Sequence, residues 1–145
     1  RLLFDLMFGP SSRLYQELYD DRLITDGFGA EYNIGERYAF SMIGGDTRDP
    51  EELAERVRRE VERWKEEGVP EAAFERIRKK RIGGFFRFLN SPESIAGEFI
   101  KYRFRGTNLF RIPEVYESLT PDEVTARLRE HFDWDRHAVC VVSGE

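Results

Sequence analysis

Apolar residues recur every three or four positions at the start of the chain, first within residues 4–8 and again within residues 14–18. The turn-forming sequence Gly9-Pro10-Ser11-Ser12 separates the two groups. This spacing predicts two helices joined by a turn. Between Gly27 and Asp46 the pattern changes to alternation, with aromatic or aliphatic residues at every second position, which predicts a β-hairpin.

Three later segments begin as helices often begin, with a capping residue followed by proline and glutamate. They start at Asp49-Pro50, Ser91-Pro92 and Thr120-Pro121. The first predicts a helix to about Glu67, with an apolar face that consists of Leu53, Ala54, Val57, Val61 and Trp64.

A further helical pattern runs from Glu71 to Asn90 and contains the pair Gly83-Gly84. Two glycines inside a helix cost roughly 2 kcal/mol relative to alanine. The pair therefore predicts either a bend in this helix or the close approach of another element.

The chain ends in an apolar run, Ala138 to Val142, which predicts a strand buried on both faces. Cys140 lies in this run, so a small buried thiol is expected, with a reactive thiol as the alternative. The order of elements predicts one α+β domain over residues 1–145, with an antiparallel-rich sheet in one layer and helices in the other. Three strands are few for so many helices, so exposed strand edges are also expected.

Composition narrows the functional classes. The 145 residues are 40% hydrophobic, enough for one domain with a core. Twenty-three basic and 28 acidic residues give a net charge of -5, which argues against a nucleic-acid partner. No apolar stretch approaches the roughly 20 residues of a membrane-spanning helix, and a cytoplasmic location is expected. Residue 1 is Arg in an apolar helical pattern, so the chain is expected to begin inside an element of a longer protein.

Few residues are candidates for chemistry. His131, His137 and Cys140 are the only plausible nitrogen or sulfur ligands, and their spacing fits no zinc motif. Neither H-E-x-x-H nor H-x-x-E-H occurs, so the fragment is expected to hold no metal and to be inactive alone. Gly44-Gly45-Asp46 lacks the ending of a phosphate loop. The basic run Arg76–Arg81 fits a solvated helix face or docking to an acidic partner.

The segment Phe8-Gly9-Pro10-Ser11-Ser12-Arg13-Leu14-Tyr15-Gln16-Glu17-Leu18 resembles the G-x-x-S-R-L-[FY]-x-E-[IL] run of the pitrilysin and mitochondrial processing peptidase family of zinc metallopeptidases, the inverzincins. The aromatic hairpin, Gly44-Gly45-Asp46-Thr47 and the segment from Phe74 to Lys80 are similar too. Residues Arg81 to Phe110 resemble a bacterial processing-protease-like branch, in which two related subunits pair. The similarity spans nearly the whole chain.

The resemblance implies a partial LuxS/processing-peptidase-like metallohydrolase domain from the C-terminal half of the family's fold. Members enclose the substrate between two halves, and the first half carries H-x-x-E-H and a distant Glu for zinc. The other half generally supplies an Arg and, seven residues on, a Tyr that bind the substrate backbone. Alignment of Glu17-Leu18 with the family's E-[IL] places Tyr19 at the Arg position and Asp26 at the Tyr position. Tyr19 can still donate a hydrogen bond, whereas Asp26 brings a negative charge where the family presents a neutral phenol.

The resemblance therefore implies a zinc-free C-terminal lobe that forms a chamber wall, contacts peptide, and pairs with the catalytic half of the same protein or with a paralogous subunit. Zinc is expected in that catalytic half. The alternative is a non-catalytic peptide-binding or scaffolding module from an inactive paralogue, and an H-x-x-E-H motif in the full-length protein would distinguish the two. The isolated fragment is expected to self-associate through open strand edges or through the first helix, Leu2 to Phe8, for which no cover is expected.

Overall fold

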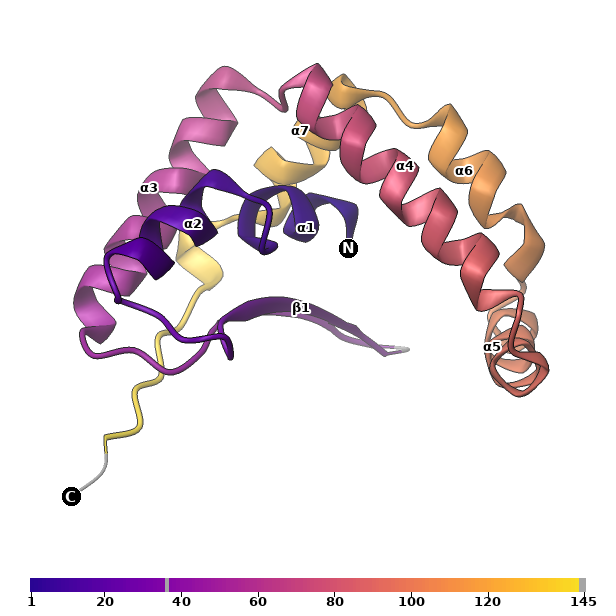
Figure 1. Ribbon diagram of the computed structural model, residues 1–145, viewed down its shortest axis with the longest axis horizontal. Coiled ribbons are helices and arrows are strands. Elements are labelled where there is room, and N and C mark those ends of the chain that lie inside the picture. The colour runs from indigo at the N-terminus through magenta and orange to yellow at the C-terminus, as the bar shows by residue number, and fades with distance from the viewer. Residues whose placement is uncertain (36, 144–145) are drawn as a thin grey trace.

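The computed structural model describes residues 1–35 and 37–143. The α-helices, strands and 3-10 helices (η) are, in chain order, α1 (Leu2–Phe8), α2 (Arg13–Asp20), β1 (Gly29–Ile34), β2 (Ala39–Gly44), α3 (Pro50–Glu67), α4 (Glu71–Phe88), α5 (Pro92–Phe104), η1 (Leu109–Arg111), α6 (Ile112–Ser118), α7 (Pro121–His131) and η2 (Trp134–Arg136). Figure 1 shows α1, α2, α3 and α7 gathered near the hairpin, while α4 and α6 extend side by side toward α5. The α+β class predicted from the sequence is confirmed.

Helix α1 lies at the centre of the core. Five of its seven residues are buried, among them Met7 and Phe8, which are 0% and 1% exposed. The helix packs against α2, β1 and α4, and the rings of Phe4 and Phe8 each lie 6.3 Å from the ring of Phe132, just beyond α7. The expectation that this first helix lacks cover is therefore wrong, because residues from later in the chain cover it.

Strands β1 and β2 form the predicted antiparallel hairpin, with Gly29 opposite Gly44 and Ile34 opposite Ala39. Glu36, at the predicted turn, lies outside the described residues. One face of the hairpin packs on the core through Ala30, Tyr32 and Ile43. The other face carries Phe40 and Met42, which are 46% and 53% exposed. In the described part of the chain the sheet has these two strands alone.

The predicted helix starts are confirmed in atomic detail. Asp49 Oδ1 accepts a hydrogen bond of 3.0 Å from the backbone N–H of Glu52 at the start of α3. At the start of α7, the side chain of Thr120 accepts from Glu123 N–H and the Glu123 carboxylate accepts from Thr120 N–H, which makes a complete capping box. Such caps satisfy backbone donors that have no partner inside the helix.

Helix α4 continues without a break through Gly83 and Gly84. No atom lies within 4 Å of a Cβ built on either glycine, so no described element approaches closely there. None of the helices described for residues 1–35 and 37–143 is both long and apolar enough to cross a membrane. Helix α6 was not predicted, because it is seven residues long and lacks a side-chain cap.

The predicted final strand is wrong for this structure. Residues Ala138 to Val142 have no assigned secondary structure and are exposed, and the thiol of Cys140 is exposed rather than buried. The physical reason is that a strand depends on hydrogen bonds to a neighbouring strand, and in the described part of the chain none pairs with this segment.

Candidate functional site

The turn before α2 depends on a glycine and a buried serine. A Cβ on Gly9 would lie 2.5 Å from the backbone oxygen of Asp5, so a larger residue would collide with the end of α1. Ser12 is 6% exposed, and its hydroxyl accepts a hydrogen bond of 3.2 Å from the N–H of Tyr15. The Gly and Ser of the G-x-x-S-R-L run therefore set the direction of α2.

The end of α2 is fixed by a left-handed residue. Arg22 has φ 55°, and it is the one non-glycine residue with positive φ in the described chain. The N–H of Leu23 donates to Leu18 O and the N–H of Arg22 donates to Tyr19 O, both at 2.9 Å. This is the hydrogen-bond pattern of a Schellman motif. The buried side chain of Leu23 then anchors the loop that carries Asp26.

The buried ring of Tyr15 contacts Tyr19 on one helix and Phe28, near Asp26, on the loop that follows. The Tyr19 side chain, 47% exposed, stacks on Tyr15 with ring centroids 6.2 Å apart and an interplanar angle of 11°. The ring of Tyr15 also lies 6.0 Å from that of Phe28, two residues after the exposed Asp26. Neither the Tyr19 hydroxyl nor the Asp26 carboxylate has a hydrogen-bond partner among the described residues. Both groups are therefore available to a ligand.

The loop of Asp26 is held by the segment after β2. Ile24 forms an isolated bridge with Thr47, and the hydroxyl of Thr47 donates to Leu23 O at 2.7 Å. A Cβ on Gly45 would lie 2.6 Å from Phe28 Cα, so the backbones meet at a distance that only glycine permits. The Gly-Gly-Asp-Thr segment thus positions this loop.

Helix α3 supports α2 through charged side chains. Arg56 on α3 binds the Asp21 carboxylate at 2.6 Å. The buried Glu60 accepts hydrogen bonds from the indole of Trp64 at 2.7 Å and from the guanidinium of Arg63 at 2.6 Å. Its hydrogen bond raises the pKa of Arg63 above the ordinary arginine value. Glu60 also lies 4.0 Å from Arg13 of α2 and joins the two helices.

The two histidines and the cysteine line one hollow of the described structure without forming a metal-binding group. His131 Nε2 lies 2.6 Å from the Ser41 hydroxyl, and its ring packs against Phe4 and Tyr32, with burial lowering the pKa of His131. His137 packs against Trp134, with ring centroids 5.4 Å apart. Among residues 1–35 and 37–143 no three His, Cys, Asp or Glu side chains form a group that could hold a metal ion.

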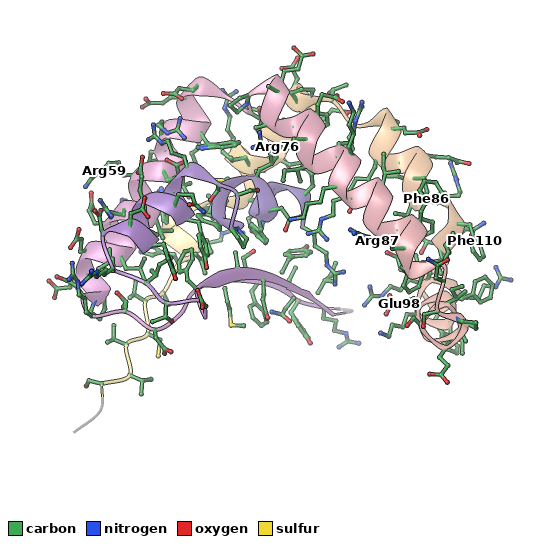
Figure 2. All side chains as sticks on the ribbon, viewed as in Figure 1. Arg59, Arg76, Phe86, Arg87, Glu98 and Phe110 are labelled. Atoms are coloured by element: carbon green, nitrogen blue, oxygen red, sulfur yellow. The ribbon has the colours of Figure 1, made fainter. Side chains whose placement is uncertain are left out.

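The basic run of α4 divides into paired and unpaired cations. Arg78 binds Glu75 at 2.8 Å and Arg81 binds Asp5 at 2.5 Å. Arg76 is exposed on the same helix (Figure 2). Lys79 and Lys80 are exposed as well. Both the solvated face and electrostatic docking remain compatible with this arrangement.

The far end of the α4–α6 arm carries exposed aromatic side chains. Phe86 and Phe110 are 57% and 50% exposed (Figure 2). Phe104 is 87% exposed. Helix α5 has no buried residue at all in the described structure. This exposed surface was not predicted from the sequence, because the same residues have the spacing of a helix that packs on a core.

Comparisons with known proteins agree with this geometry. Residues 1–81 match the family described as the peptidase M16 inactive domain. The chain is 38% identical over 141 residues to a protein of Bacillus subtilis (strain 168) described as the uncharacterized zinc protease YmfH, and the match covers 97% of this chain and 33% of that protein.

Solved structures show the same fold. A protein from Alicyclobacillus acidocaldarius described as an M16-like peptidase superposes with a TM-score of 0.85 at 32% identity, over 90% of this chain and 31% of that one. The inactive peptidase domain of a zinc protease from Bordetella parapertussis superposes with a TM-score of 0.66 at 16% identity, over 87% of this chain and 70% of that domain. The chain spans about a third of the length of the first two relatives. By the match of residues 1–81, the chain belongs to the M16 peptidase family, as part of the inactive domain of that family.

Proposed function

We propose that residues 1–145 form part of the non-catalytic C-terminal lobe of a bacterial zinc peptidase, and that this lobe is a wall of the substrate chamber. In this proposal the catalytic half of the same protein, or a paralogous subunit, holds the zinc and hydrolyses the peptide. The match of residues 1–81 to an inactive peptidase domain carries the proposal. The free thiol of Cys140 is compatible with work in the reducing cytoplasm.

Tyr19 and Asp26 are the proposed contacts with the peptide. Their polar groups have no partner among the described residues, and Gly45 and Leu23 hold the Asp26 loop against the rest of the fold. Tyr19 would donate to a backbone carbonyl of the substrate, and Asp26 would accept from a backbone N–H. Asp26 would also favour peptides with a basic side chain nearby, because its carboxylate is negative at neutral pH.

The proposed pairing surface is the exposed end of the arm. Phe86, Phe104 and Phe110 present apolar area that soluble proteins rarely leave open. Cover by the catalytic half or by a second subunit would remove this area from water. Burial of each ring would contribute about 1.5–3 kcal/mol to the association.

The experiment restores the family's residues in the intact protein, as the double variant Tyr19→Arg with Asp26→Tyr. A guanidinium that donates to a substrate carbonyl contributes about 1.5–3 kcal/mol, so the dissociation constant for peptide should fall roughly 10- to 100-fold. The exposed Glu66 on α3 supplies a control of equal charge change, Glu66→Arg, whose affinity should stay at the wild-type value. Unchanged affinity in the double variant would place Tyr19 and Asp26 outside the chamber.

The second candidate is a peptide-binding scaffold that has lost catalysis, and the identities of Tyr19 and Asp26 favour it, because both depart from the substrate-binding pair of the family. Zinc content and peptide cleavage by the intact protein separate the candidates. One zinc per protein and chelator-sensitive cleavage support the peptidase. Peptide binding without zinc and without cleavage supports the scaffold.

A further inference from the structure

The hairpin has one face that takes no part in the core. Side chains at even-numbered positions of β1 and at odd-numbered positions of β2 turn toward the helices. Successive side chains of a strand point to opposite faces. The alternate positions therefore form a second face, here called the free face, which consists of Gly29, Glu31 and Asn33 on β1 and Phe40, Met42 and Gly44 on β2. Figure 1 shows α1 on one side of the hairpin and no described helix on the opposite side.

A continuous row of large apolar side chains follows β2 on the free face. Phe40 and Met42 occupy alternate positions, and Tyr38, which is 62% exposed, stacks on Phe40 with ring centroids 5.9 Å apart and an interplanar angle of 27°. We call these three residues the apolar row. Across the ladder, Glu31 lies opposite Met42 and Asn33 lies opposite Phe40. The free face thus has one apolar row beside one polar row.

The base of the free face is bare backbone next to carboxylates. Gly29 lies opposite Gly44, and no atom lies within 4 Å of a Cβ built on either residue. Asp26 lies three residues before Gly29 in the sequence. A Cβ built on Gly27 would lie 4.0 Å from Oδ2 of Asp46, so a second carboxylate is present at this end. A ligand backbone can therefore approach the glycine pair closely, beside two negative charges.

The spacing along β2 matches that of an extended peptide. A strand rises ~3.3 Å per residue, so Phe40 lies about 13 Å from Gly44, with Met42 halfway between them. An extended peptide has the same rise. When one of its residues lies over the glycine pair, the residues two and four positions away lie over Met42 and Phe40. Those positions also share one face of the peptide, because side chains of an extended chain alternate.

We propose that the free face selects the side chains of the bound peptide. In this proposal the peptide lies extended along the hairpin, with a basic residue at the carboxylates of Asp26 and Asp46 and large apolar residues over the apolar row. The inference rests on the proposed chamber-wall function and deepens it by naming the substrate class. These substrates are extended peptides in which a basic residue is separated from apolar residues by two and by four positions.

The chemistry of the free face favours a peptide over a permanent protein partner. The apolar row is one strand wide and lies beside the polar side chains of Glu31 and Asn33, whereas obligate interfaces between subunits are larger and more apolar. Met42 adds a flexible, polarisable side chain, which adapts to apolar groups of different shape. The carboxylates at the base complement a basic side chain, and the face continues the proposed peptide contact at Asp26.

The test uses the intact protein, treated with a chelator so that captured peptides are not cleaved. The probe is a pool of 12-residue peptides with lysine fixed at the sixth position and random residues elsewhere. Peptides captured on the immobilised protein are sequenced by mass spectrometry. Phe, Tyr, Leu and Met should be enriched roughly fivefold at two and at four residues from the lysine, on one side of it, because each buries apolar area against the row.

The double variant Phe40→Ser with Met42→Ser should lose this enrichment at both positions. The matched control is Ile34→Ser, which removes an apolar side chain of similar exposure, 51%, from the other face of the same hairpin and should keep the wild-type profile. Circular dichroism shows whether each variant folds. If the double variant does not fold, the single variant Met42→Ser decides, because it should lose the enrichment at two residues from the lysine and keep that at four.

Capture of peptides without an apolar preference, or a preference that survives in the folded double variant, would overturn this inference and leave the proposed chamber wall intact. If the wild-type protein captures no peptide at all, the proposed function is wrong together with the inference. A lower molar mass of the double variant in light scattering, with an unchanged peptide profile, would also overturn the inference, because the free face would then bind a second copy of the protein.

Discussion

Two adjacent glycines give a sharp test of how the Asp26 loop is held. A Cβ at Gly45 would lie 2.6 Å from Phe28 Cα and 2.9 Å from Gly27 O, whereas nothing lies within 4 Å of a Cβ at Gly44. Ordinary contact begins at 3.4 Å, so Gly45→Ala must move one backbone by about 0.8 Å. Overpacking of this kind costs roughly 1–3 kcal/mol of unfolding free energy. Gly44→Ala should stabilise the fold by about 0.5–1 kcal/mol, because alanine has fewer unfolded conformations to lose.

Urea titration followed by the emission of the buried Trp64 measures both variants. The two unfolding free energies should differ by roughly 1.5–4 kcal/mol. Amide exchange at Phe28, whose N–H donates to Thr25 O at 3.1 Å, gives a local reading that should rise in Gly45→Ala alone. Equal stabilities and equal exchange would refute the argument that the two backbones meet at Gly45.

Four further predictions concern stability, metal, pH and association. Glu60→Ala should lower the unfolding free energy by about 2–4 kcal/mol, because it leaves the buried Trp64 indole without an acceptor and the Arg63 guanidinium with Glu67 alone. The exposed Glu55→Ala should change it by less than about 0.5 kcal/mol, and equal losses would contradict this reasoning. The purified 145-residue chain should contain no stoichiometric zinc by elemental analysis after dialysis, and one zinc per chain would be decisive against the reasoning from ligand number. Burial in the folded state lowers the pKa of His131, so the folded protein favours the neutral imidazole. The contribution of His131 to the unfolding free energy should therefore be complete above about pH 6.5 and decline as the pH falls below that value. His131→Gln should remove this part of the pH dependence of the unfolding free energy, as measured by urea titration at several pH values. Light scattering at micromolar concentration should show that the isolated chain forms species larger than 17.1 kDa, and Ala39→Pro should reduce the fraction of these species. If both the wild-type chain and the variant are monomers, association through open strand edges is wrong.

Local signals predicted the helices and the hairpin well. A cap such as Asp49 or Thr120 acts within three residues, so the sequence alone contains the whole interaction. The run from Ala138 to Val142 was misjudged because strand formation depends on a partner that the sequence pattern does not locate. Its β-branched residues favour the strand conformation, but a strand forms only where a neighbouring strand supplies hydrogen bonds.

The family motif predicted where the candidate site lies in the sequence, but it did not predict the contacts that hold the surrounding residues in place. Gly9 and Ser12 act as their positions in the motif imply. The contact of Ser41 with His131 joins residues 90 positions apart, and nothing in the spacing could have indicated it. The hydrogen bond from the Trp64 indole to Glu60 joins residues only four positions apart. It could not be predicted, because the sequence of a charged helix does not show which of its acidic residues is buried.

The central place of α1 has a consequence for synthesis on the ribosome. Phe4 and Phe8 emerge at the start of this segment, yet Phe132, which covers both rings, is made more than a hundred residues later. At roughly 5–20 residues per second, the delay is on the order of ten seconds. Helix α2, strand β1 and helix α4, which also pack on α1, are made earlier, so the cover of α1 is assembled in stages. Until Phe132 is made, the two phenylalanine rings lack the last part of that cover, and a chaperone that binds short apolar sequences could hold them in this interval.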